Sequence, residues 1–211
     1  MGLVRCQISI SLDGFVAGPD QSVADPIGVG GMRLHEWVFQ TASWRAMHGQ
    51  DGGERSADDR VVEQAFVGIG AHVMGRNMFG GGSGPWDERW RGWWGEDPPF
   101  HAPVFVLTHH ERAPLPMQGG TTFTFVTDGL ESALEQARAA AGERDVAVAG
   151  GASTVRQALA AGALDELQLH IVPVILGRGE RIFDDVGDPV LEPVEVVAST
   201  GVTHVRYRIA R

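Results

Sequence analysis

The stretch DVAVAGGASTVRQALAAG, residues 145–162, decides how the rest of the chain is read. Its alternating valines between charged residues predict a short buried strand. Gly150 and Gly151 follow at once, and residues 152–161 have the apolar spacing of a helix that stops at Gly162. Two glycines at a helix start expose backbone N–H groups where the helix dipole favours an anion. The stretch therefore indicates either a pyrophosphate cradle or an ordinary tight turn, and on its own it favours neither.

Outward from this stretch, strand patterns alternate with helix patterns and then give way to strands alone. This order predicts an α/β fold whose central mixed sheet is parallel in the middle and ends in an antiparallel C-terminal hairpin. No linker divides the chain, so we expect one domain over residues 1–211. The predicted strands are 4–12, 71–74, 104–107, 123–126, 166–174, 190–199 and 202–210, and the predicted helices are 34–48, 56–69 and 128–141. Capping boxes are expected at Ser56 with Asp59 and at Asp128 with Glu131.

Composition excludes several classes of protein. The chain contains no lysine, and all 17 basic residues are arginine. Lysine Schiff-base chemistry and the Walker A phosphate site are therefore excluded, although arginine binds phosphate well. A net charge of −10 argues against nucleic-acid or anionic-membrane partners. With one cysteine, Cys6, no intrachain disulfide can form, and the polar breaks in residues 4–12 argue against a signal peptide. We expect a cytoplasmic protein.

Polar residues follow two further predicted strands. Gly75 and Arg76 follow residues 71–74, and Thr108 and His109 follow residues 104–107. Ligands of open α/β sheets bind at the carboxyl ends of the strands, where Arg76 could reach a phosphate. A surface arginine after a turn is the simpler interpretation of Arg76 alone. A zinc site at the adjacent histidines is disfavoured, because their spacing is not that of a metal motif; we expect no metal.

The sequence resembles the dihydrofolate-reductase-like superfamily, and within it the reductase domain of the bacterial riboflavin-biosynthesis deaminase/reductase. The resemblance runs nearly from end to end. The segments that carry it are SISLDGFVAG (9–18), MGRNMF (74–79), VFVLTHH (104–110), VAGGASTVRQAL (148–159) and LDELQLHIVPVILGRGERIF (164–183).

The resemblance implies a three-layer fold with helices flanking the sheet, and a homodimer. It also implies that NADPH binds at the strand ends, with its pyrophosphate on the 150–154 turn and with Arg76 favouring NADPH over NADH. The implied cofactor residues are Gly75, Arg76, Thr108, His109, Gly150, Gly151, Ala152, Ser153, Thr154 and Gly177. The implied substrate-side residues are Ser11, Leu12 and Asp13.

The chain also departs from the pattern of these relatives. The substrate-binding stretch of the riboflavin enzymes is not recognisable, and residues 19–60 stand in its place. A tryptophan-rich loop at 86–94 is added, and it could wall a flat substrate or fill a dimer interface. Asp13 is the one candidate catalytic acid, although Asp13-Gly14 could be only a turn.

These observations predict an NADPH-dependent reductase. We expect it to transfer a hydride to a C=N or C=O group of a small heterocycle, pterin-like or ribosylamino-pyrimidine, as in riboflavin or folate metabolism. The alternative is a non-catalytic module on the same fold that binds a nucleotide or a pterin. A flavin- or metal-dependent enzyme is less consistent with the pattern.

Overall fold

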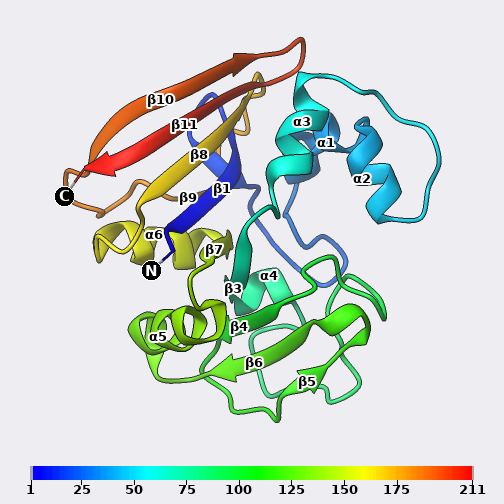
Figure 1. Ribbon diagram of the computed structural model, residues 1–211, viewed down its shortest axis with the longest axis vertical. Coiled ribbons are helices and arrows are strands. Elements are labelled where there is room, and N and C mark those ends of the chain that lie inside the picture. Colours follow the sequence, from blue (N-terminus) through cyan, green and yellow to red (C-terminus); the bar gives the residue numbers. More distant parts are fainter. Residues whose placement is uncertain (1, 211) are drawn as a thin grey trace.

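The computed structural model describes residues 2–210 (Figure 1). Its strands are β1 Val4–Ser11, β2 Phe15–Ala17, β3 Ile69–Gly75, β4 Pro103–Leu107, β5 Leu115–Pro116, β6 Thr122–Val126, β7 Asp145–Gly150, β8 Glu166–Val172, β9 Glu180–Arg181, β10 Val190–Ala198 and β11 Thr203–Ala210. Its helices are α1 Glu36–Phe39, α2 Ala42–Met47, α3 Ala57–Gln64, α4 Arg76–Phe79, α5 Gly129–Ala141 and α6 Ala152–Ala160, with 3₁₀ turns at Gly31–Leu34 and Gln118–Gly120.

Nine strands form one sheet in the order β10-β11-β8-β1-β7-β3-β4-β6-β5. The six strands from β8 to β6 run parallel, and β10, β11 and β5 are antiparallel to their neighbours. The predicted mixed sheet with a parallel centre and an antiparallel C-terminal hairpin is therefore confirmed. Because the parallel strands end at one edge, the segments after β7, β3 and β4 are neighbours in space.

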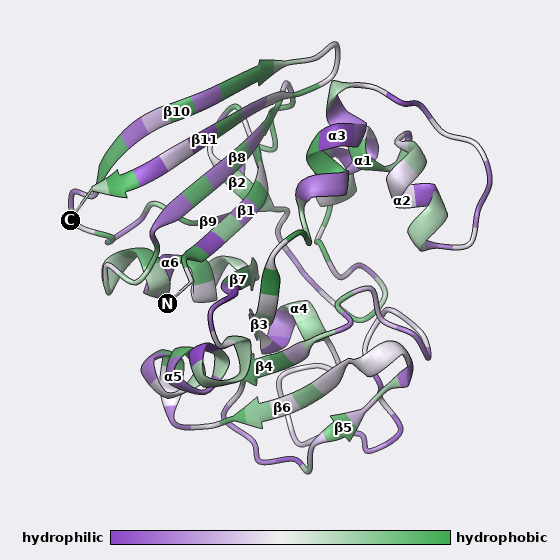
Figure 2. Ribbon diagram, viewed as in Figure 1, coloured by the Kyte–Doolittle hydropathy of each residue, from purple (hydrophilic) through white to green (hydrophobic). Residues whose placement is uncertain are grey.

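The two faces of the sheet differ because successive side chains of a strand point to opposite sides. One face carries the main core, in which Cys6 and Val148 pack against helices α5 and α6. Figure 1 shows these two helices together beside the sheet. The resulting alternation of hydrophobic and hydrophilic residues is visible along β10 and β11 in Figure 2. The opposite face carries a second core under α4 and the 80–99 loop, with Met74, Phe79 and Phe123 fully buried.

The expected helix 34–48 is wrong as one element. A 3₁₀ turn and the short helices α1 and α2 occupy this region, and they are interrupted at Thr41. Thr41 has extended backbone angles, and its hydroxyl accepts a hydrogen bond from Trp44 N at 3.3 Å. Threonine therefore acts here as the N-cap of a new helix, which competes with continuation of the previous one.

The two predicted capping boxes also differ from expectation. Ser56 Oγ accepts from Asp59 N at 3.3 Å, but the Asp59 carboxylate accepts from Ser43 N at 2.7 Å instead of completing the box. Asp128 makes no side-chain capping bond at all to α5. Helix α3 also ends at Gln64 rather than at Ile69, and β8 ends at Val172.

A buried chain of polar groups attaches α3 and α1 to the sheet. The Asp58 carboxylate lies 2.9 Å from His204 Nε2, and His204 Nδ1 lies 2.8 Å from His170 Nδ1. The ring of Trp37 packs against both imidazoles, with centroids 4.9 Å apart in each case. Side-chain contacts to β8 and β11 therefore hold these short helices in place.

Candidate functional site

A cavity of about 620 Å³ lies at the carboxyl ends of three adjacent strands, β7, β3 and β4. The structure brings together on its wall nine of the residues that the sequence singled out for a cofactor. They are Gly75, Arg76, Thr108, His109, Gly150, Gly151, Ala152, Ser153 and Thr154.

The start of helix α6 supplies backbone donors to this cavity. Gly151 is the N-cap, no side chain caps the helix, and no acidic residue lies in its first turn. Gly150 has φ of 136°, a conformation that side-chain-bearing residues rarely adopt. A Cβ added to Gly151 would meet nothing within 4 Å, so the space beside this peptide is open to a ligand. The free N–H groups of a first helical turn favour an anion at this position.

Glycine at position 75 is required by packing. A Cβ there would lie 2.5 Å from the hydroxyl oxygen of Thr154. The end of β3 therefore approaches the first turn of α6 more closely than any larger residue allows, and it places Arg76 directly beside that turn.

Arg76 is a buried cation that lacks a carboxylate partner among residues 2–210. Its side chain donates to Thr108 Oγ1 at 3.4 Å and to the Gly84 carbonyl at 2.6 Å, and its guanidinium lies 3.5 Å from the centre of the Trp86 ring. The buried Nε has no hydrogen-bond partner in the described chain. Burial and the positive charge of nearby Arg112 lower the pKa of Arg76. An anion in the cavity would relieve this uncompensated charge.

The other end of the cavity is apolar. Trp93 and Trp94 line it and belong to the 86–94 loop, which the sequence suggested could wall a flat substrate. His35, from the segment before α1, also lines it and was not identified from the sequence. Burial lowers the pKa of His35 to about 4, so the imidazole is neutral at pH 7. The only advance signals were the length of the 19–60 segment and the density of tryptophan in the 86–94 loop. The further lining residues at this end include Val16, Ala17, Pro26 and Ile27.

Trp93 and Trp94 line the cavity, whereas Trp86 and Trp90 do not. Trp86, Trp90 and Trp94 all pack against the second core, with Trp86 against Phe79 and Phe125. A Cβ on Gly80 would lie 2.5 Å from the Trp93 ring, so the glycines at the start of the loop allow this packing.

Ser11, Leu12, Asp13 and Gly177, which the resemblance placed beside the cofactor or substrate, do not line the cavity. Ser11 Oγ donates to Asp13 at 2.6 Å, and the Leu12 side chain is exposed. The Asp13 carboxylate accepts from Leu176 N at 3.1 Å and from Gly177 N at 2.6 Å. These bonds tie the β1–β2 turn to the 174–177 loop.

The hydrogen bonds also fix the charge of Asp13. The bond from Ser11 and those from the backbone of Gly177 and Leu176 lower the pKa of Asp13 to about 2. Asp13 is therefore a carboxylate at neutral pH and carries no proton to donate. Its contacts suit a residue that positions the loop better than the proton donor that the sequence suggested.

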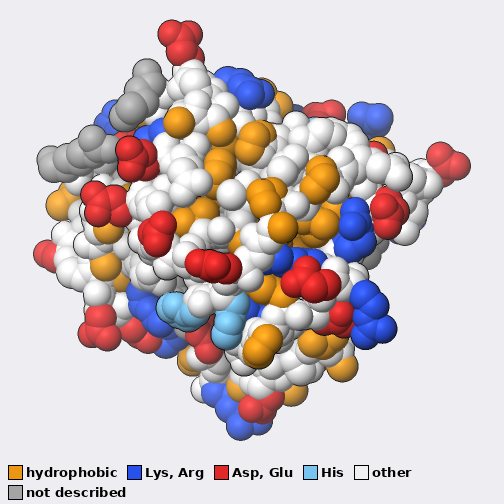
Figure 3. All heavy atoms as spheres, turned by 90° about the horizontal axis from the view of Figure 1, so that it is seen from below, with side chains coloured by type: hydrophobic (Ala, Val, Ile, Leu, Met, Phe, Trp, Pro, Cys, Tyr) orange, Lys and Arg blue, Asp and Glu red, His pale blue; other side chains and the backbone are white. Residues whose placement is uncertain are grey.

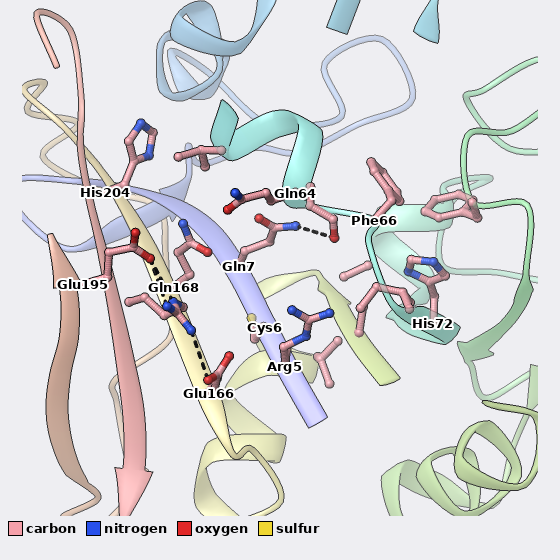
Figure 4. A pocket seen from close by; sticks show the side chains of 18 of the residues that line it. Arg5, Cys6, Gln7, Gln64, Phe66, His72, Glu166, Gln168, Glu195 and His204 are labelled. Atoms are coloured by element: carbon pink, nitrogen blue, oxygen red, sulfur yellow. Dashed lines mark hydrogen bonds and ion pairs between the residues drawn. The ribbon is translucent and has the colours of Figure 1, made fainter. Parts of the chain in front are cut away.

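A second cavity, of about 330 Å³, lies on the face of the sheet away from α5 and α6 (Figure 4). It is lined by Arg5 and Gln7 of β1, by Gln168 of β8, and by His72 of β3. Ala149 and Met78 line both cavities, so the two spaces meet at the end of β7.

Elsewhere the charged groups are dispersed. On the face shown in Figure 3, arginine and acidic side chains are interspersed around a band of hydrophobic groups. Within residues 2–210 no cluster of three or more histidine, cysteine or acidic side chains could hold a metal ion. In the same residues no helix has the length and apolar character needed to cross a membrane.

Comparison with known proteins matches this chain to one family. The family model described as the RibD C-terminal domain matches residues 3–205. A search of curated protein sequences found no match.

Similar solved structures carry the same fold. A protein from Shewanella sp. PV-4, described as a riboflavin biosynthesis protein, is 18% identical with a TM-score of 0.63, and 99% of each chain is covered. A diaminohydroxyphosphoribosylaminopyrimidine deaminase/5-amino-6-(5-phosphoribosylamino)uracil reductase from Thermotoga maritima is 16% identical with a TM-score of 0.57; the match covers 99% of this chain but only 57% of that one. Dihydrofolate reductase from Enterococcus faecalis, complexed with NADP(H) and RAB-propyl, is 13% identical with a TM-score of 0.50, over 100% and 98% of the two chains. These likenesses show the dihydrofolate-reductase-like fold.

Proposed function

The chain belongs to the RibD C-terminal domain family, and from that membership together with the cavity we propose that it is an NADPH-dependent reductase of a small heterocycle. The observation that carries the proposal is the buried guanidinium of Arg76 beside the uncapped start of α6. A cation without a carboxylate partner in the described chain and a set of free backbone donors together suit a dinucleotide with several phosphates.

Different residues of the large cavity would bind different parts of NADPH. The backbone N–H groups of Ala152 and Ser153 would bind the pyrophosphate beside Thr154, whose own N–H donates to the Gly151 carbonyl at 3.0 Å. Gly150 and Gly151 would let the pyrophosphate approach the backbone. Arg76, with Thr108 and His109, would bind the adenosine-side phosphate that distinguishes NADPH from NADH. The apolar end would exclude water from the reacting groups.

The chemistry itself belongs to the cofactor. When bound, NADPH would supply the hydride for the carbon of a C=N or C=O group, whose nitrogen or oxygen would take a proton. Asp13 would hold the 174–177 loop through its bonds to Leu176 and Gly177 rather than give up a proton. Because the chain covers 57% of the bifunctional Thermotoga protein, only a reductase activity is proposed here.

The decisive experiment is a titration of NADPH and NADH, followed by tryptophan fluorescence, with wild type and Arg76→Ala. Because a hydrogen bond to a charged group contributes about 1.5–3 kcal/mol, we expect Arg76→Ala to weaken NADPH binding about 10- to 150-fold. Binding of NADH should be weaker in wild type and should change less.

Arg89→Ala is the matched control, because Arg89 lies in the loop that follows α4 and its side chain is 92% exposed. It should bind NADPH like wild type. If neither cofactor binds to wild type, the Gly150-Gly151 turn is only a turn and the reductase proposal fails. Tight NADPH binding without oxidation by a panel of pterins, pyrimidines, imines and aldehydes would instead favour a binding module.

A further inference from the structure

The second cavity has a wall that is built for hydrogen bonding (Figure 4). Its residues come from the face of β1 and β8 that alternates with the main core, so their polar ends project into the space instead of into packed side chains. Gln7, Gln64 and Gln168 bring three amides to it. Gln7 Nε2 donates to the Ala65 carbonyl at 3.2 Å, which leaves its carbonyl oxygen as an acceptor toward the cavity.

His72 gives this wall an unused nitrogen. The residue is only 3% exposed, and its Nε2 has no hydrogen-bond partner within the described chain. Its ring packs beside Phe66 and Phe100, with centroids 6.0 and 5.0 Å away. In Figure 4 His72 and Phe66 lie together at the β3 end of the cavity. A buried polar atom without a partner in a cavity wall is explained by a ligand that supplies the partner.

Each arginine in the wall of this cavity is paired with at least one carboxylate. Arg206 pairs with Glu195 at 3.0 Å and with Glu166 at 3.4 Å. Arg5 pairs with Asp145 at 3.0 Å. Burial holds the pKa of His72 at about 4, so this imidazole adds no charge at pH 7. The arginines here have carboxylate partners, whereas Arg76 in the large cavity has none in the described chain.

The cavity meets the proposed cofactor site at one boundary. Ala149 precedes the Gly150-Gly151 turn and lines both spaces, as does Met78. A Cβ on Gly150 would lie 3.1 Å from the Met78 sulfur. The flexible Met78 side chain therefore lies at the boundary between the two cavities. A molecule in the second cavity would therefore lie next to the site proposed for NADPH.

We propose that the second cavity is the acceptor site, and that it selects an uncharged, planar, amide-edged heterocycle that carries no phosphate. Gln7, Gln168 and His72 recognise the ring edge, and Met78 forms the boundary with the cofactor site. This inference rests on the proposed function. It differs from the phosphorylated substrate named for the Thermotoga protein.

The test measures binding of lumazine, a fluorescent pteridinedione, at pH 6, where the ring is uncharged, with and without NADPH. Uridine and uridine 5′-monophosphate then compete for the site; they share a ring and differ by a phosphate. We expect lumazine to bind, uridine to displace it, and the monophosphate to be at least 10-fold weaker. Gln168→Leu should weaken lumazine binding about 10-fold without changing NADPH binding.

Gln136→Leu on α5, at an exposed position, is the matched control and should leave lumazine binding unchanged. His72→Leu is a second cavity variant and should also weaken lumazine binding. Met78→Phe is a third variant, which narrows the boundary between the two cavities. It should raise the KM of any acceptor more than the Kd of NADPH. Lumazine binding that none of the cavity variants alters, or equal competition by the monophosphate, overturns the proposal while leaving the reductase function intact. Variant-sensitive lumazine binding in a chain that fails to bind NADPH would support the site and refute the reductase.

Discussion

Arg76 and His72 each carry a buried nitrogen without a hydrogen-bond partner in the described chain, as do Trp93 in the wall of the large cavity and Arg5 in that of the second. An unsatisfied buried donor or acceptor costs about 1–3 kcal/mol of folding free energy, and a charged one costs more. Arg76 Nε and His72 Nε2 both lack a partner within residues 2–210, and each lines a different cavity. An anionic ligand at Arg76 and a neutral ligand at His72 would offset this cost.

Asp13 gives the sharpest prediction at the residue scale. A general acid contributes about 10²- to 10⁴-fold to the rate, whereas a carboxylate that only orients a loop contributes less. With a pKa of about 2, Asp13 is ionised throughout the range in which the enzyme would be assayed. We therefore expect Asp13→Asn to retain kcat within about 10-fold and to keep the wild-type pH profile, measured by NADPH oxidation from pH 5 to 9.

The control for this prediction is Asp184→Asn, which alters an exposed carboxylate paired with Arg181 at 3.1 Å. A loss of more than 100-fold in kcat for Asp13→Asn, together with loss of one limb of the pH profile, would restore Asp13 as the proton donor.

Three histidines with pKa values lowered by burial predict how stability depends on pH. Burial lowers the pKa of His35 and His72 to about 4, and burial together with His204 and His35 lowers that of His170 to about 3. The unfolded chain takes up these protons near pH 6.5, so stability is complete above that pH and falls as the solution becomes more acidic. A pKa that is lower by one in the folded chain than in the unfolded chain corresponds to about 1.4 kcal/mol.

We therefore expect the free energy of unfolding to drop by about 2–6 kcal/mol between pH 7.5 and pH 5, measured by urea denaturation. His72→Phe removes one of the groups and should reduce the drop by about 1–2 kcal/mol. An unchanged pH dependence in that variant would show that His72 is not held neutral by the fold.

Helix α6 is the element on which the cofactor site depends, and its N-terminus can be tested apart from any side chain of the site. Ala152 is the first residue of α6, and an aspartate there would place a negative charge where a phosphate is expected. The same charge interacts favourably with the helix dipole by about 0.3–1 kcal/mol. Ala152→Asp should thus weaken NADPH binding at least 10-fold while the melting temperature stays the same or rises.

Ala57→Asp is the matched control, because Ala57 is the first residue of α3, away from the large cavity. It should leave NADPH binding unchanged. If Ala152→Asp binds NADPH as well as wild type does, the pyrophosphate does not lie at the start of α6.

Elements with strong local signals could be predicted from the sequence, and those determined by tertiary contacts could not. The 145–162 stretch carries its own alternation, glycines and helix stop, and β7 and α6 form within about one residue of the expected limits. The 34–48 region has helical spacing as well, but Thr41 starts a new helix there and Trp37 packs on two distant histidines. Spacing cannot reveal contacts with residues more than a hundred positions away.

At the scale of the whole molecule, the two cavities follow from the order of the strands. Segments that follow β7, β3 and β4 are far apart in the chain, and the parallel sheet alone makes them neighbours. The expectation of a ligand at this edge needed only the strands and their polar ends. The second cavity joins β1, β3, β8, β11 and α3, and nothing local in those segments marks it. The alternation of a strand shows which residues share a face, but not which faces meet.

The outer edge of the sheet bears on the homodimer expected from the family resemblance. Strand β10 pairs with β11 on one side only, and it exposes Val190, Val194 and Val196 by 59, 45 and 62%. Exposed edge strands with apolar side chains readily pair with another chain. We propose that two copies associate through β10, and we expect light scattering at micromolar concentration to give twice the mass of one chain.

Val196→Lys tests this edge directly, because it places a charge on the apolar strand and should shift the mass toward that of the monomer. Val67→Lys is the control, since Val67 is 65% exposed and lies outside the sheet edge. A monomeric wild type would remove the homodimer. A dimer insensitive to Val196→Lys would place the interface elsewhere.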